Sequence, residues 1–179
     1  MLEHFRDDSQ RTGPSRHGLA HLLLVDDDPA LLEALSGTIQ SRLGQCSLDT
    51  CDSGMKALDL VRSNGYDTII VDVNMPKMDG LKLLSAVKQL RPDTPVLMMT
   101  AYADDTIMAQ AFEAGALDFL AKPFDRGEFV LAVEEGLELA RLQSVAGNLA
   151  ERHRRTSEKI AHARERIHQH TLTKLKDRL

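Results

Sequence analysis

The sequence predicts an α/β fold in which five parallel strands alternate with five helices. Short apolar runs recur along the chain, and a segment with helical apolar spacing follows each of them. Helix signals separate these segments, such as Asp28-Pro29 before the first helical stretch and Gly44 after it. Strands separated by helices favour right-handed crossovers, and therefore a parallel sheet with helices on both faces.

The expected elements follow one another at regular intervals. We expect strands at 22–25, 46–50, 68–71, 95–99 and 117–121. We expect helices from 29 up to Gly44, at 54–62, 81–90 and 104–114, and from 126 past 142. The first and third strands are the most apolar and are expected at the centre, whereas the second is expected at an edge. This pattern fits the doubly wound, flavodoxin-like strand order 2-1-3-4-5, with an additional C-terminal helix.

Length and charge divide the chain into three parts. Residues 1–18 are polar without periodicity and are expected to form a disordered arm, and residues 19–143 are expected to form the folded domain. Residues 144–179 are expected to form a basic helical extension with a net charge of +5, while the rest of the chain carries −10.

No apolar run reaches the roughly 20 residues of a membrane span. With only two cysteines, a reduced, cytoplasmic setting is expected.

Chemically active side chains lie at the carboxyl ends of four predicted strands. They are Asp26 and Asp27, Asp72, Thr100 and Lys122. In this sheet order, ligands bind at the carboxyl ends of the strands, beside the switch point between strands one and three. Each residue alone has an ordinary explanation, such as a solvated carboxylate or a surface lysine. Their joint placement at one rim favours a functional site.

The residue types at this rim indicate phosphoryl chemistry. Three carboxylates in one pocket repel each other and need a cation, and oxygen ligands favour Mg²⁺. Lys122 adds a positive charge, so that metal and lysine together could offset the charge of an incoming phosphoryl group. A carboxylate can act as the nucleophile and form an aspartyl phosphate. Asp72 is the best candidate, because it stands alone at the end of a central strand, across from Asp26 and Asp27.

At these positions the sequence resembles the receiver domains of bacterial response regulators. The resemblance covers about residues 20–143 and rests on the segments LLVDDDP (23–29), DVNMPKMDG (72–80), MTAY (99–102) and GALDFLAKPF (115–124). It implies a two-component signalling protein that accepts a phosphoryl group from a sensor histidine kinase or a phosphotransfer protein. It also implies that the chain is not an enzyme, except that it assists its own phosphorylation and dephosphorylation.

The resemblance also implies roles for the acidic residues. Asp72 is expected to be the phosphoacceptor. Asp27 is expected to ligate Mg²⁺ directly, with Asp26 often acting through water. Asp72 itself and the backbone carbonyl of Asn74 complete the expected metal ligands.

The remaining site residues are expected to respond to the phosphoryl group. Thr100 and Lys122 are expected to contact it, and the Lys122-Pro123 bond is expected to be cis. Phe119 occupies the position of the switch aromatic and is expected to turn inward when Thr100 moves. The side chains of Asn74 and Tyr102 are expected to tune the rate of dephosphorylation.

The extension leaves its own role open. Its apolar residues follow helical spacing in three groups: Leu142, Val145 and Leu149; Ile160, Ala163 and Ile167; Leu172, Leu175 and Leu179. Residues 152–158 interrupt this stripe, and Gly147 weakens a helix by about 1 kcal/mol relative to Ala. The pattern fits either a dimeric coiled coil or a solvated helix. Binding to nucleic acid is not expected, because no recognised motif accompanies the basic residues, and no membrane contact is expected.

Three functions compete. The first is a stand-alone receiver or relay intermediate, whose fourth helix, fifth strand and fifth helix bind a downstream protein. The second is a transcriptional regulator that acts through the extension or through an output domain outside this chain. The third is a phosphohydrolase of the haloacid dehalogenase type, but such an enzyme expects a second Asp two residues after the nucleophile, where this chain has Asn74.

Overall fold

The computed structural model describes residues 19–44, 46–102 and 104–176, with side chains described as far as residue 161. The expected N-terminal arm, residues 1–18, lies outside the described residues, and so do the side chains of the apolar positions expected beyond residue 161. Within the described part of the chain, none of the helices is both long and apolar enough to cross a bilayer.

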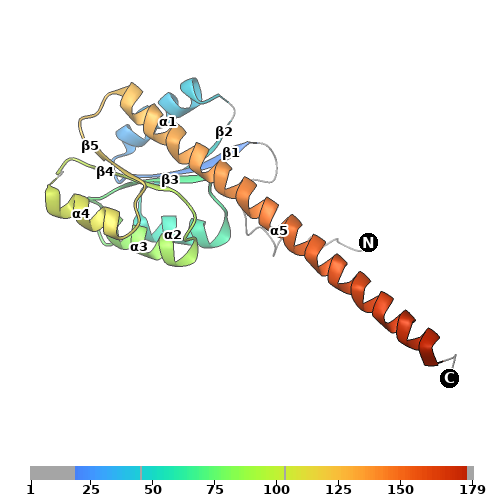
Figure 1. The fold of residues 1–179 in the computed structure, drawn as a ribbon. Helices are drawn as coiled ribbons and strands as arrows, with labels where there is room; N and C mark the ends of the chain where they lie inside the picture. Colours follow the sequence, from blue (N-terminus) through green and yellow to red (C-terminus); the bar gives the residue numbers. More distant parts are fainter. Residues whose placement is uncertain (1–18, 45, 103, 177–179) are drawn as a thin grey trace, which may run out of the picture. The chain divides into compact units, whose positions relative to one another are not determined.

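Five parallel strands form a single sheet (Figure 1). They are β1 (Ala20–Val25), β2 (Cys46–Cys51), β3 (Thr68–Asp72), β4 (Val96–Thr100) and β5 (Asp118–Ala121). Their order is β2-β1-β3-β4-β5, so the predicted topology is confirmed, with β2 at an edge and β1 and β3 inside the sheet. The switch point therefore lies between β1 and β3, where Val25 is in register with Val71.

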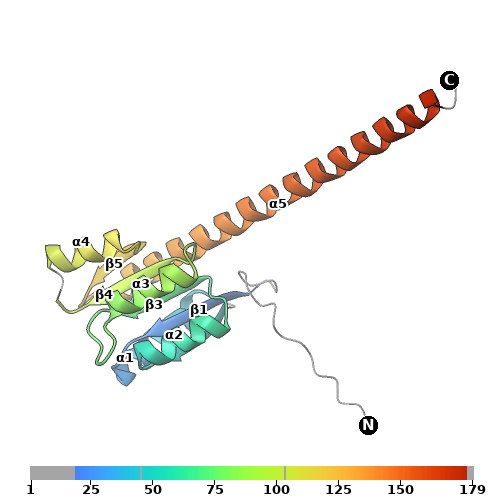
Figure 2. The same ribbon diagram turned by 90° about the horizontal axis from the view of Figure 1, so that it is seen from below.

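Helices cover both faces of the sheet (Figures 1 and 2). They are α1 (Pro29–Arg42), α2 (Gly54–Ser63), α3 (Gly80–Leu90), α4 (Asp105–Glu113) and α5 (Arg126–Lys176). Because side chains alternate along a strand, Leu22 and Leu24 pack against α1 and the first turns of α5, whereas Leu23 and Val25 pack against α2 and α3. Most of β1 and all of β3 and β4 are buried on both faces, which explains why these strands read as continuous apolar runs.

Side-chain caps fix where three helices begin. The Asp28 carboxylate accepts hydrogen bonds from the backbone N–H groups of Ala30 and Leu31 at the start of α1. Asp79 and Asp104 cap α3 and α4 in the same way. Such caps typically contribute about 1 kcal/mol each. The sequence identified the first of them from the Asp28-Pro29 pair.

The chain divides into two compact units, one ending at Arg141 and the other beginning at Leu142. The first unit contains the sheet and its covering helices. In the second unit α5 continues as helix to Lys176. Residues 152–158, which interrupt the apolar stripe in the sequence, are helical like their neighbours.

Candidate functional site

Four strand ends bring the predicted residues to one edge of the sheet. Asp26 directly follows β1, Asp72 ends β3, Thr100 ends β4, and Lys122 directly follows β5. The backbone N–H of Lys122 donates to the carbonyl oxygen of Thr100 at 2.7 Å, which extends the pairing of β4 and β5 as far as the lysine. The carboxyl edge of the sheet therefore carries two carboxylates, a hydroxyl and an ammonium from four neighbouring strands.

The Lys122 ammonium bridges the two carboxylates. Its Nζ lies 2.6 Å from Asp26 Oδ2 and 2.6 Å from Asp72 Oδ1. Asp26 and Asp72 are only 1% and 4% exposed, so the lysine is the cation that keeps two buried charges paired. The sequence placed these three residues together but did not show that one ammonium contacts both acids.

Burial and charge act in opposite directions on this cluster. Burial raises the pKa of the Asp72 carboxyl, and the neighbouring Asp26 charge adds to the effect, while the Lys122 ammonium opposes it. Burial alone would lower the pKa of Lys122, but hydrogen bonds and charges from Asp26 and Asp72 together raise it. Asp72 is therefore a desolvated carboxyl group whose pKa stays raised although an ammonium is paired with it, and such perturbed groups are typical of functional sites.

Backbone N–H groups orient the second oxygen of each carboxylate. Asp72 Oδ2 accepts from the N–H of Asn74 at 2.6 Å, and Asp26 Oδ1 accepts from the N–H of Asp28 at 2.9 Å. The loop after β3 folds back tightly, because the N–H of Gly80 donates to the carbonyl of Val73 at 2.9 Å. A Cβ at Gly80 would lie 2.8 Å from Val73 Cα, so only glycine allows this approach.

The oxygen atoms at this edge suit a hard cation, although the described side chains do not form a complete metal site. Among the described residues, no three His, Cys, Asp or Glu side chains converge closely enough to hold a metal ion. Asp27 is exposed, while Asp26 and Asp72 already share Lys122. Mg²⁺ needs only one or two carboxylates and keeps several waters, so these carboxylates and the Asn74 carbonyl are chemically suited to it.

Thr100 contacts Asn74 in this structure. The buried Thr100 hydroxyl donates to Asn74 Oδ1 at 3.1 Å and accepts from the Tyr102 N–H at 3.2 Å. The Tyr102 side chain is 70% exposed, and Phe119 is half-buried against the core that faces α2 and α3. Asn74 thus contacts the Thr100 hydroxyl through its side chain, and Tyr102 contacts it through its backbone N–H. The Lys122-Pro123 bond is cis, as the resemblance implied.

A polar network lies away from this edge and was not foreseen in the sequence. His21 Nε2 lies 3.1 Å from Asp49 Oδ2, and the Tyr66 hydroxyl donates to the same oxygen at 2.7 Å. This network ties β1, β2 and the segment before β3 together and contains none of the predicted site residues. No local motif signals it, because its members come from three separate segments.

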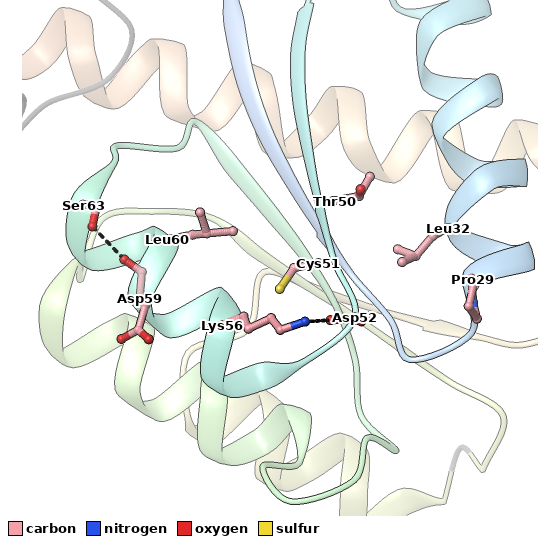
Figure 3. A pocket seen from close by; sticks show the side chains of 9 residues that line it. All are labelled: Pro29, Leu32, Thr50, Cys51, Asp52, Lys56, Asp59, Leu60 and Ser63. Atoms are coloured by element: carbon pink, nitrogen blue, oxygen red, sulfur yellow. Dashed lines mark hydrogen bonds and ion pairs between the residues drawn. The ribbon is translucent and has the colours of Figure 1, made fainter.

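A cavity of about 670 Å³ lies beside the edge strand β2, between α1 and α2 (Figure 3). Lys56 Nζ pairs with Asp52 Oδ1 at 2.9 Å on its wall. The lining residues are Pro29, Leu32, Thr50, Cys51, Asp52, Lys56, Asp59, Leu60 and Ser63. None of them is a predicted site residue, so the predicted chemistry does not depend on this cavity.

Part of the chain is similar in sequence to curated bacterial transcriptional regulators. Transcriptional regulatory protein GlrR of Escherichia coli K12 is 35% identical over 122 residues, which are 68% of this chain and 27% of that protein. DNA-binding transcriptional regulator NtrC of Klebsiella pneumoniae is 37% identical over 114 residues, 64% of this chain and 24% of that protein. This chain therefore spans about a quarter of the length of these relatives.

The fold is also found among solved structures. A CheY-like response regulator receiver domain protein from Methanospirillum hungatei JF-1 superposes with a TM-score of 0.66 at 24% identity, covering 70% of this chain and 98% of that one. At this identity the similarity establishes the fold alone. The family description "Response regulator receiver domain" matches residues 22–134, a span that includes every predicted site residue. The chain therefore belongs to the response regulator receiver domain family.

Proposed function

We propose that this receiver accepts a phosphoryl group on Asp72 from a sensor histidine kinase or a phosphotransfer protein, in a reaction that requires Mg²⁺. The observation that carries the proposal is the cluster of Asp26, Lys122 and Asp72 at the switch point of the sheet. The family match supports the reaction class, and the buried, lysine-paired carboxylate supports Asp72 as the acceptor.

The proposed transfer exchanges one bond for another. The phosphorus–nitrogen bond of the donor's phosphohistidine breaks, and its electron pair returns to the imidazole, while an Asp72 oxygen bonds to phosphorus. Lys122 contacts Asp72 Oδ1 before transfer and would then pair with an oxygen of the attached phosphoryl group. Mg²⁺, held by Asp26, Asp27, Asp72 and the Asn74 carbonyl, would offset the remaining phosphoryl charge.

The proposed signal begins at Thr100. In this account its hydroxyl leaves Asn74 and bonds a phosphoryl oxygen, and Phe119 turns into the space that this movement opens. The downstream protein would then bind the face formed by α4, β5 and the first turns of α5. Phe112 of α4, an apolar side chain that is 48% exposed, supports the use of this face as a binding surface.

Intact-protein mass spectrometry after incubation with acetyl phosphate tests the proposal. The wild-type chain should gain the mass of one phosphoryl group in the presence of Mg²⁺, and EDTA should prevent the gain. The variant Asp72→Ala should fold but gain nothing, since its nucleophile is absent.

The control is Asp59→Ala, which removes an exposed carboxylate on α2 that pairs with the neighbouring Arg62. This variant should label like the wild type. Equal labelling of Asp72→Ala and the wild type would refute the proposed acceptor.

A second candidate output follows from the relatives. Both curated relatives are named as transcriptional regulators and extend well beyond the region that matches this chain. We propose transcriptional control, through the basic extension or a further output domain, as the alternative to a stand-alone receiver. DNA binding that weakens as salt rises would favour it, and the absence of binding at low salt would exclude it for this chain.

A phosphohydrolase activity is the weakest candidate. The position where the haloacid dehalogenase mechanism expects a second Asp holds Asn74, and its side-chain oxygen accepts the Thr100 hydroxyl. We propose instead a cytoplasmic signalling protein that is not an enzyme, except that it assists its own phosphorylation and dephosphorylation. Turnover of a phosphate ester by the purified chain would revive the enzymatic alternative.

A further inference from the structure

One hydrogen bond joins the switch hydroxyl to the loop that follows Asp72. The Thr100 hydroxyl, which is fully buried at the end of β4, donates to Asn74 Oδ1 at 3.1 Å. It also accepts from the backbone N–H of Tyr102 at 3.2 Å. A hydroxyl group has a single proton, so in this structure Asn74 holds the only proton that the Thr100 side chain can donate.

The backbones on both sides of this hydrogen bond are held in place. Asn74 lies between Val73 and Met75, which are both only 6% exposed. The carbonyl of Thr100 accepts from the backbone N–H of Lys122 at 2.7 Å, which fixes the end of β4. The bond can therefore open by rotation of the two side chains alone, about torsions that have discrete staggered positions.

Asn74 also contacts the proposed acceptor, Asp72. Its backbone N–H donates to Asp72 Oδ2 at 2.6 Å, while its side chain holds the Thr100 hydroxyl. One residue thus contacts the acceptor and the switch hydroxyl at the same time. Asn74 is exposed although Thr100 is not, so its side chain can leave the hydroxyl and turn into solvent without creating a buried, unpaired amide.

A phosphoryl group on Asp72 would compete with Asn74 for this proton. Phosphoryl oxygens accept hydrogen bonds, so Thr100 can donate to one of them only by withdrawing its proton from Asn74 Oδ1. A hydrogen bond between neutral groups shifts an equilibrium by about fivefold, whereas one to a charged acceptor shifts it by roughly ten- to hundredfold. The Asn74 bond is therefore strong enough to hold Thr100 at rest and weak enough for a phosphoryl group to displace it.

We propose that Asn74 is a positioning residue that acts through Thr100, and that its side-chain oxygen is a latch that holds the switch hydroxyl in the resting position. The inference rests on the proposed function, because the phosphoryl group on Asp72 is what opens the latch. It gives Asn74 a role before phosphorylation, in addition to the expected effect of its side chain on the rate of dephosphorylation. The latch sets how often Thr100 reaches the active position in the unphosphorylated chain.

Binding of beryllofluoride, a phosphoryl mimic that is not hydrolysed, tests the latch in a double-mutant cycle of the full chain. At saturating Mg²⁺, Asn74→Ala should lower the dissociation constant of beryllofluoride about fivefold, because the Thr100 proton is no longer held. In a Thr100→Val background, which has no hydroxyl to hold, Asn74→Ala should change the constant by less than about twofold. The control Asn148→Ala removes an exposed asparagine of the second unit and should leave the constant unchanged.

An equal change in both backgrounds, or no change in either, would overturn the latch. NMR of the chain without Mg²⁺ or a phosphoryl mimic supplies a second readout that does not depend on the proposed function. Three-bond couplings of the Thr100 methyl carbon should show one χ1 rotamer in the wild type and a second, populated rotamer in Asn74→Ala. The same single rotamer in both chains would contradict the latch. A wild-type chain that binds no beryllofluoride would instead refute the proposed function, and the couplings would still decide the latch.

Discussion

At the scale of single residues, Lys122 determines the electrostatic state of the site. Its ammonium is 2.6 Å from an oxygen of each of two buried carboxylates, Asp26 and Asp72. Both acids are almost fully buried, so solvent stabilises their charges little and the lysine takes over that role. The residue types at the strand ends predicted that carboxylates and an ammonium would lie together. The contact of Lys122 with both acids was not predictable, because it depends on how far one flexible side chain reaches.

Replacing this lysine should make stability depend on pH. In Lys122→Met the opposing charge is lost, and burial raises the pKa of Asp72 further above its ordinary value. The folded variant then retains a proton that the unfolded chain releases above about pH 4, so its stability falls as pH rises through the raised pKa. Urea denaturation should show a loss of about 3 kcal/mol at pH 8 and a smaller loss at pH 5.

The matched control for this experiment is Lys56→Met, which removes the exposed partner of Asp52. It should leave stability nearly unchanged at both pH values, because the pair is exposed to solvent. A loss in Lys122→Met that is the same at both pH values would contradict the role assigned to the lysine. Added Mg²⁺ should restore part of the lost stability at pH 8, because a cation would again offset the two carboxylates.

At the scale of elements, the site depends on where strands end and on how tightly the following loops turn. The alternation of apolar runs and helical segments predicted all five strands. The greater apolarity of the first and third strands placed them inside the sheet, because a strand buried on both faces must be apolar on both faces. It placed several boundaries one or two residues away. β1 begins at Ala20, for example, because Ala20 and His21 pair with Cys46 and Ser47 across the edge of the sheet. Such pairing is invisible within a single segment.

The turn after β3 provides a test at this scale. In Gly80→Ala the new methyl carbon would lie 2.8 Å from Val73 Cα, closer than such atoms approach, so the backbone that holds Asp72 must move. We expect a loss of about 2–4 kcal/mol in the free energy of unfolding, together with slower labelling by acetyl phosphate.

Gly37→Ala is the matched control, because a Cβ there meets nothing within 4 Å on the exposed side of α1. It should leave stability unchanged or raise it by up to about 1 kcal/mol, since Ala favours helix. Equal stability of the two alanine variants would show that the β3–α3 turn does not constrain the site as described.

At the scale of the whole molecule, the chain combines a receiver with a second helical unit. The acidic body and the basic extension differ in net charge in the sequence. In the structure, the boundary between the two compact units falls between Arg141 and Leu142. The helical extension was predictable from composition, and it continues through Gly147, where a Cβ would meet nothing within 4 Å. The sequence did not make apparent that the apolar residues of the extension stay on one side of the helix. A seven-residue repeat is interrupted at residues 152–158, whereas an eleven-residue repeat keeps these residues on the same side.

The central claim concerns the chemistry of the receiver, on which the proposed latch between Asn74 and Thr100 also rests. It states that the phosphoryl group resides on Asp72 rather than on Asp26 or Asp27. All three carboxylates belong to the same edge of the sheet, so a gain in mass alone does not distinguish them.

The most direct measurement is to treat the phosphorylated wild-type chain with borohydride, which reduces an aspartyl phosphate to homoserine, and to sequence the peptides by mass spectrometry. The account predicts homoserine at position 72 only, present after acetyl phosphate and Mg²⁺ and absent when EDTA is added. Homoserine at position 26 or 27, or at no position in a chain that has gained phosphoryl mass, would contradict the assignment of Asp72 as the acceptor.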